Sequence, residues 1–222
     1  MTPPFTVYDS RNDLRNIVVM PEIRGRFLRM EPGEVGPFHS HDVGQELFLV
    51  LAGQAEFEID GVRQVVGPGQ LCVARAGELH EVRVIGEQPM TLFLTVTPHL
   101  EPTHTLWDGD QPLPPVYGYW TPAGLGDQEP PTATLADLAA AQALALADLA
   151  TKIETQGRIL AEAEATLRQT DVDADPQRAK AAVDAVWAEL RPTYVAFTRL
   201  VATWNQLALR MGITQANERA DQ

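Results

Sequence analysis

The segment that most constrains the fold is residues 33–53, where two histidines and a glutamate stand at fixed distances between two glycines. Its sequence is GEVGPFHSHDVGQELFLVLAG. Alternate side chains of a β-strand point to the same face, so His39 and His41 would share one face of one strand. After a short turn, Glu46 on the next strand can reach the same point. Two imidazoles and a carboxylate are typical ligands of a divalent transition metal, so this segment predicts a metal site.

Short predicted strands surround this segment at regular spacing. Beyond a possible short strand near residues 17–20, the expected strands cover residues 24–30, 38–41, 46–51, 54–59, 62–66, 70–74, 80–85 and 90–97. Glycine-rich turns separate them, and Asp60-Gly61 is a strong signal for a tight hairpin. This pattern predicts a mainly β domain, built as an antiparallel β-barrel or jelly roll.

A fourth ligand is available further along the chain. Residues 69–80, GQLCVARAGELH, predict a strand, then a turn at Gly77, and then His80 at the start of another strand. His80 is therefore a candidate to complete a site of three histidines and one glutamate. Three imidazoles and a carboxylate suit Fe, Mn, Ni, Cu or Zn alike, so the ligand set leaves the metal open.

Together these residues resemble the cupin superfamily, whose members are small β-barrels with two short motifs. The first motif, G-x5-H-x-H-x(3,4)-E-x6-G, is matched with every spacing correct by Gly33, His39, His41, Glu46 and Gly53. The second motif, G-x5-P-x-G-x2-H-x3-N, is matched by Gly69, Gly77 and His80. Arg75 replaces its proline, and Val84 replaces its asparagine. The resemblance covers residues 24–97.

The resemblance implies a cupin-type jelly roll with one divalent metal per chain, held by His39, His41, Glu46 and His80. It favours a metal-dependent enzyme acting on a small organic molecule, with a dioxygenase preferred over a lyase or isomerase. Glu46 could also act as a base. The alternative is a non-catalytic cupin that binds a metal and a small ligand and assembles through its C-terminal helices.

Residues around the predicted site are less constrained by the sequence. On the strand at 24–30, either Arg24 and Arg26 or Phe27 and Arg29 face the interior, and an interior arginine would suit a carboxylate substrate. Two further histidines, His99 and His104, are expected to lie in exposed loops, with a role as an acid or base beside the metal as the alternative.

After residue 97 the pattern changes. Residues 98–131 contain eight prolines, and four large aromatic side chains suggest a structured arm: Trp107, Tyr117, Tyr119 and Trp120. From residue 132, apolar residues recur at helical spacing on both sides of a short loop at 170–175, which predicts an antiparallel two-helix hairpin ending near Gly212. We therefore divide the chain into a cupin barrel (1–106), an arm (107–131) and a helical hairpin (132–222), and expect a homodimer.

Composition narrows the possible partners. The 222-residue chain has a formal net charge of −13, which would repel nucleic acid. Cys72 is the single cysteine, which fits a reducing compartment. The first residues lack a signal-peptide pattern, and the Ala-rich stretch at 135–150 is interrupted by Asp137 and Asp148, so no membrane span is expected. These features predict a cytoplasmic protein.

Overall fold

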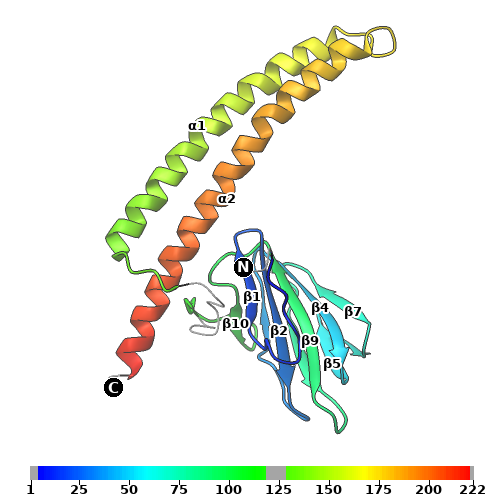
Figure 1. Ribbon diagram of the computed structural model, residues 1–222, viewed down its shortest axis with the longest axis vertical. Helices are drawn as coiled ribbons and strands as arrows, with labels where there is room; N and C mark the ends of the chain where they lie inside the picture. Colours follow the sequence, from blue (N-terminus) through cyan, green and yellow to red (C-terminus); the bar gives the residue numbers. More distant parts are fainter. Residues whose placement is uncertain (1–4, 119–128, 221–222) are drawn as a thin grey trace. The chain divides into compact units, whose positions relative to one another are not determined.

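The computed structural model describes residues 5–118 and 129–220, so Tyr119 and Trp120 of the predicted arm lie outside the described residues. The described part contains two β-sheets followed by two long helices (Figure 1). The first sheet has the order β1-β2-β9-β4-β7. Its strands are β1 (Asn16–Met20), β2 (Ile23–Met30), β9 (Met90–Thr97), β4 (Gln45–Ala52) and β7 (Leu71–Ala74).

The second sheet has the order β11-β10-β3-β8-β5-β6. Its strands are β11 (Gln111–Pro112), β10 (Thr105–Asp108), β3 (His39–Ser40), β8 (His80–Val84), β5 (Ala55–Ile59) and β6 (Val62–Val66). All of the strand pairs in both sheets are antiparallel. The β5–β6 hairpin turns at Asp60-Gly61, and both of these residues have positive φ, as the sequence predicts.

The two sheets pack face to face through one apolar core. Phe48, Val50 and Leu92 come from the first sheet, and Phe57 and Val84 come from the second. These residues point inward because side chains along each strand alternate between the core and solvent. The strand pattern and the jelly-roll character were predictable from the regular spacing of short strands and glycine turns in the sequence.

The expected closed barrel is wrong, because the two sheets form a sandwich with open edges. Strands β6 and β7 are edge strands of different sheets and do not pair with each other. Residues of both strands, including Val65 and Leu71, line a cavity of about 600 Å³. The separation between these edges prevents the backbone hydrogen bonds that would close a barrel.

Two helices follow the sheets: α1 (Leu135–Arg168) and α2 (Pro176–Ala220). Helix α1 begins at the N-cap Thr134, whose side chain accepts a hydrogen bond from the backbone N–H of Asp137. Helix α2 continues through Gly212, so the expected end at this residue is wrong. A Cβ at position 212 would collide with the backbone of Tyr117, which explains the glycine by close packing.

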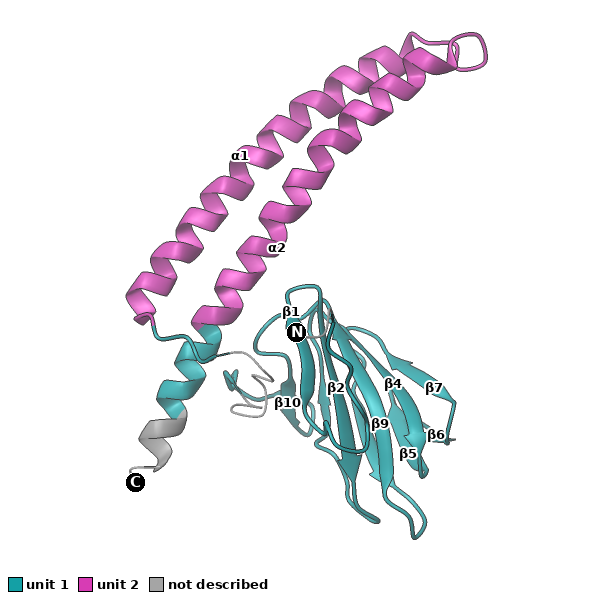
Figure 2. Cartoon of the chain, in the orientation of Figure 1, with its two compact units in different colours: residues 1–132, 208–222 teal, residues 133–207 magenta. Residues whose placement is uncertain are grey.

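The described chain divides into two compact units, coloured separately in Figure 2. One unit contains residues 1–132 and 208–222, and the other contains residues 133–207. Within the second unit, α1 and the first part of α2 lie side by side (Figure 2), and the Thr203 hydroxyl donates a hydrogen bond to the side-chain carbonyl of Gln142. Neither helix of the described chain is long and apolar enough to cross a membrane.

Candidate metal centre

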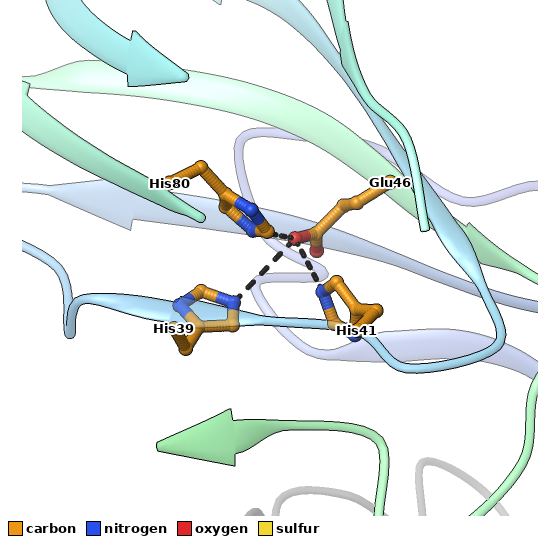
Figure 3. A group of neighbouring side chains, drawn as sticks. All are labelled: His39, His41, Glu46 and His80. Carbon is orange, nitrogen blue, oxygen red and sulfur yellow. Dashed lines mark hydrogen bonds and ion pairs between the residues drawn. The ribbon is translucent and has the colours of Figure 1, made fainter. Parts of the chain in front are cut away.

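The four predicted ligands come together between the two sheets (Figure 3). His39 lies in β3 and His80 opens β8, and the pairing of these strands places the two residues directly opposite each other. His41 follows β3 on the same segment. Glu46 reaches the cluster from β4 in the facing sheet. The site therefore depends on the packing of both sheets, although each ligand is set by a local strand.

The geometry of the cluster centres on one carboxylate oxygen. Oε2 of Glu46 lies 2.9 Å from Nε2 of His41, 3.2 Å from Nε2 of His80 and 3.7 Å from Nε2 of His39. One ligand atom from each of the four residues lies within 4.8 Å of the other three, and all four side chains are buried. One ion could therefore contact all four residues.

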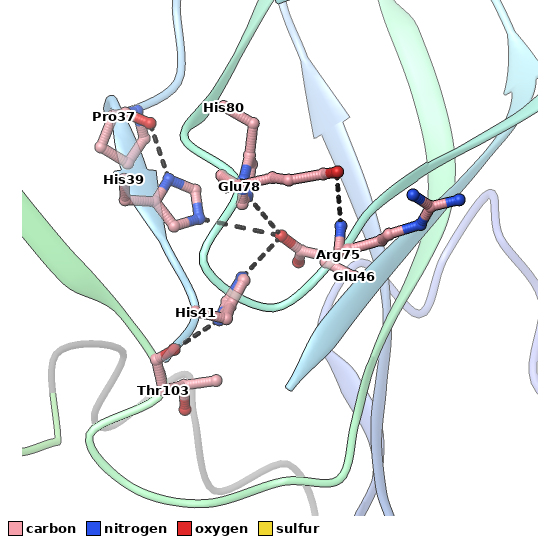
Figure 4. Close-up of polar contacts among 8 residues, drawn as sticks. All are labelled: Pro37, His39, His41, Glu46, Arg75, Glu78, His80 and Thr103. Carbon is pink, nitrogen blue, oxygen red and sulfur yellow. Dashed lines mark hydrogen bonds and ion pairs between the residues drawn. The ribbon is translucent and has the colours of Figure 1, made fainter. Parts of the chain in front are cut away.

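The second nitrogen of each ring fixes its orientation (Figure 4). Nδ1 of His39 donates to the carbonyl of Pro37, and Nδ1 of His80 donates to the carbonyl of Glu78, each at 2.8 Å. Nδ1 of His41 donates to the carbonyl of Thr103. A carbonyl can only accept, so each ring carries its proton on Nδ1. In a neutral imidazole, Nε2 then presents a lone pair toward the centre of the cluster.

This arrangement fits a divalent cation. Three Nε2 lone pairs around a carboxylate would repel it, and three imidazolium cations would bury a large excess of positive charge. A metal ion would satisfy all four groups at once. In addition, Nε2 of His39 is buried and has no hydrogen-bond partner in the described chain, as expected for an atom that binds a metal.

The electrostatics of the site keep its groups in their ligand forms. Burial raises the pKa of Glu46, but the contacts with His39, His41 and His80 outweigh this effect and hold its pKa well below the usual range. Burial also lowers the pKa of His39, although Glu46 partly opposes that shift. Glu46 is therefore a carboxylate and His39 a neutral imidazole at neutral pH.

A cavity of about 70 Å³ adjoins the cluster. His39, Glu46 and His80 form part of its wall, and Arg24 and Arg26 of β2 form another part. The face of β2 that carries Arg24 and Arg26 therefore points to the interior, which the sequence could not determine. The rest of the lining is mostly apolar: Leu28, Met30, Gly36, Pro37, Phe48, Val82, Leu94 and His104.

Two histidines lie elsewhere than expected. His99 and His104 are 3% and 6% exposed, so their assignment to exposed loops is wrong. The ring centroid of His104 lies 4.6 Å from that of His39 and 4.8 Å from that of His41. Strand β10 pairs with β3 and places Leu106 opposite His39, which brings the preceding residues over the site. This strand was not predicted because the region is rich in proline, which is rare within β-strands.

The two departures from the second motif have different consequences. Val84 is 2% exposed and belongs to the apolar core, so it keeps this part of the interior free of polar groups. Arg75 is exposed, and its backbone N–H donates to the carboxylate of Glu78 at 2.8 Å (Figure 4). This hydrogen bond stabilises the turn before His80 without a proline.

Part of the β-sheet region is similar to known proteins. Residues 26–97 match the family model described as a cupin domain. An uncharacterized conserved protein with a double-stranded β-helix domain from Klebsiella pneumoniae is 20% identical, with a TM-score of 0.40 over 41% of this chain and 89% of that chain. KdgF from Halomonas sp. is 20% identical, with a TM-score of 0.38 over 40% and 79% of the two chains.

The DMSP lyase DddQ from Ruegeria pomeroyi is 26% identical, with a TM-score of 0.37. That match covers 41% of this chain and 46% of the lyase chain, so the similarity is confined to less than half of either protein. A search of curated proteins found no match.

Proposed function

Because residues 26–97 form a cupin domain, we propose that this protein is a metal-dependent enzyme that acts on a small organic molecule between its two sheets. His39, His41, Glu46 and His80 would bind one divalent ion, which is Fe, Mn, Ni, Cu or Zn. A dioxygenase is the preferred reaction class, with a lyase or isomerase next. The observation that carries the proposal is the convergence of three Nδ1-protonated imidazoles on Glu46.

A metal bound here would supply Lewis acidity and, if redox-active, the means to activate dioxygen. The chain itself would contribute orientation and shelter from water. Backbone carbonyls hold the imidazole rings in place. Apolar side chains such as Leu28, Phe48 and Leu94 line the adjoining cavity and would limit the access of water to a substrate. Glu46 remains the candidate base because it is ionised and can accept a proton, and its low pKa makes it a weak base.

Metal analysis of protein purified without added metal tests the site. We expect about one equivalent of a transition metal in the wild type. His41→Ala should lower the metal affinity by at least about tenfold, because it removes one of four ligands. His99→Gln is the control, since His99 is buried nearby but is not one of the four clustered ligands. Full metal content in His41→Ala would refute the ligand assignment.

A screen of the metal-loaded enzyme tests the reaction class. Oxygen consumption with small organic acids, enols and phenols would support a dioxygenase, whereas turnover without oxygen uptake would support a lyase or isomerase. If no substrate is turned over with Fe, Mn, Ni or Zn, the enzyme hypothesis is rejected in favour of the non-catalytic cupin.

The two helices suggest how the protein assembles. We propose that they form an antiparallel hairpin, because Thr203 late in α2 contacts Gln142 early in α1. An exposed apolar stripe remains on α2, with spacings of four, three, four and three residues: Val183, Trp187, Leu190, Tyr194 and Phe197. On α1, exposed apolar residues recur every seven positions at Leu146, Ile153 and Leu160.

These residues form one face, because Leu160 and Val183 line the same groove between the helices. The heptad spacing is that of a helix seam, and such a seam is stable when another helix covers it. A second copy of the hairpin would cover it in a homodimer.

Two further assignments remain proposals. We retain the division into a cupin domain (1–106), an arm (107–131) and a helical hairpin (132–222). A cytoplasmic location is consistent with Cys72: burial raises the pKa of its thiol to about 12, so the thiol would stay protonated and unreactive.

A further inference from the structure

The cavity beside the metal centre contains a buried cation without a hydrogen-bond partner on one of its donor atoms. Arg24 is 3% exposed and lines this cavity. Its Nε is buried and has no hydrogen-bond partner among the described residues. A buried guanidinium loses its hydration and is normally paired with an anion that accepts its N–H groups. The unpaired donor therefore points to a partner that is not part of the described chain.

The nearby carboxylates are already engaged elsewhere. Glu46 contacts the three imidazoles through Oε2. Glu101 accepts a hydrogen bond from the Thr103 hydroxyl at 3.1 Å and lies 3.2 Å from Nε2 of His99. Both carboxylates favour the charged form of Arg24 at longer range, whereas burial lowers its pKa. They compensate the charge of Arg24 only through space.

The charge balance of the cavity favours an anion. Among the residues that the structure describes, its lining includes Arg24 and Arg26 but only one carboxylate, Glu46. A divalent ion held by the four ligands would add two further positive charges. An anionic ligand would therefore reduce an excess of positive charge, and a planar guanidinium can donate two parallel hydrogen bonds to one carboxylate group.

The remaining lining decides what kind of anion fits. Leu28, Met30, Phe48 and Leu94 would leave the oxygens of an inorganic oxyanion without partners, whereas they suit hydrocarbon. The volume of about 70 Å³ is roughly that of two water molecules in the liquid. A short organic acid matches the size, polarity and charge of this space.

We propose that Arg24, with Arg26 beside it, binds the carboxylate of a small organic acid, whose apolar part packs on Leu28, Met30, Phe48 and Leu94. This inference rests on the proposed function, because it names the substrate class of the same site. It assigns Arg24 to substrate binding and leaves the metal to the four ligands described above.

Calorimetric titration of the full chain with propionate tests the inference, using both Zn²⁺-loaded and metal-stripped protein. Propanamide has a similar shape without the charge, and we expect it to bind at least about tenfold more weakly than propionate. Arg24→Met should also weaken propionate binding at least about tenfold. Arg29→Met is the matched control, because Arg29 lies on the same strand, is half-exposed and pairs with Glu31 at 3.0 Å. The Arg29→Met variant should bind propionate with the affinity of the wild type.

Several results would overturn the inference. One is propionate affinity that is unchanged in Arg24→Met, and another is inorganic phosphate binding more tightly than propionate. If Arg24→Met does not fold, Arg24→Gln gives the same comparison. Metal content is measured separately in every sample. Arg24-dependent propionate binding by protein that takes up no metal would support this inference and refute the metal site, whereas metal uptake without propionate binding would do the reverse.

Discussion

At the scale of single residues, burial sets the protonation of two histidines beside Glu46, His39 and His104. Burial lowers the pKa of His39 and lowers that of His104 further, and Arg24 adds to the shift at His104. In the unfolded chain both groups return to a pKa of about 6.5. The unfolded state therefore binds more protons than the folded state when the pH falls below this value, and acid should destabilise the fold.

We accordingly predict that the metal-free protein keeps its full stability above pH 6.5 and loses it as the pH falls. Each histidine contributes a slope of up to about 1.4 kcal/mol per pH unit. Glu46, whose pKa in the folded protein lies well below its usual value of about 4.5, adds to the loss only below about pH 4.5. Urea unfolding between pH 7.5 and 5 measures the slope, and His104→Gln should reduce it. A stability that does not change over this interval would contradict the prediction.

The clustering of the four candidate ligands was predictable from the sequence because each is placed by a local rule. His39 and His41 are two residues apart on one segment, and His80 follows a glycine turn at the start of a strand. Arg24 and His104 were not predictable as site residues. The facing direction of β2 depends on which side of the sheet is covered, and His104 reaches the site only because β10 pairs with β3.

At the scale of secondary structure elements, two glycine turns allow the cost of backbone strain to be distinguished from the cost of steric crowding. Gly53 follows β4 with φ of 71°, and Gly61 lies in the β5–β6 hairpin with φ of 77°. A Cβ at Gly61 would meet no atom within 4 Å, whereas a Cβ at Gly53 would collide with the carbonyl of Pro89. Both positions require a conformation that costs a non-glycine residue about 1–2 kcal/mol.

We therefore predict that Gly61→Ala lowers the free energy of unfolding by about 1 kcal/mol, and that Gly53→Ala lowers it by about 1–3 kcal/mol more because of overpacking. Chemical denaturation of both variants measures the difference. Equal losses would mean that the backbone near Pro89 moves away without cost, and that Gly53 is required only for its φ.

The elements themselves could be predicted wherever the sequence has a clear period. The first nine strands lie close to the ranges predicted from short stretches between turn residues, and both helices follow a 3–4 repeat. Two regions did not follow local signals. Strands β10 and β11 lie in a proline-rich region, and they form because an edge of the second sheet is available to pair with them. Helix α2 continues past Gly212. This glycine is explained by the close approach of the Tyr117 backbone and does not mark the end of the helix.

At the scale of the whole molecule, an open sandwich and an exposed helical face both leave apolar surface uncovered in a single chain. Val65 and Leu71 are 54% and 53% exposed at the edges of the two sheets. The helical face contains more exposed apolar residues and has a regular repeat, and a contiguous exposed apolar face normally marks an interface. Sequence analysis could propose a partner chain from the length of the predicted hairpin. It could not separate the residues that pack between α1 and α2 from those left exposed.

The proposed homodimer therefore predicts that the exposed apolar stripe of α2 lies in the interface. Trp187 and Tyr194 lie in the exposed stripe and are 62% and 56% exposed, and Val195 is equally exposed at 60%. Val195 lies in a different groove of the two helices, beside Arg191 and Arg199.

The double variant Trp187→Glu/Tyr194→Glu should be monomeric, because paired stripes would bury four carboxylates without partners. Val195→Glu should remain dimeric. Light scattering on size-exclusion fractions measures the masses. A wild-type monomer, or dissociation by Val195→Glu alone, would contradict the assignment of this face.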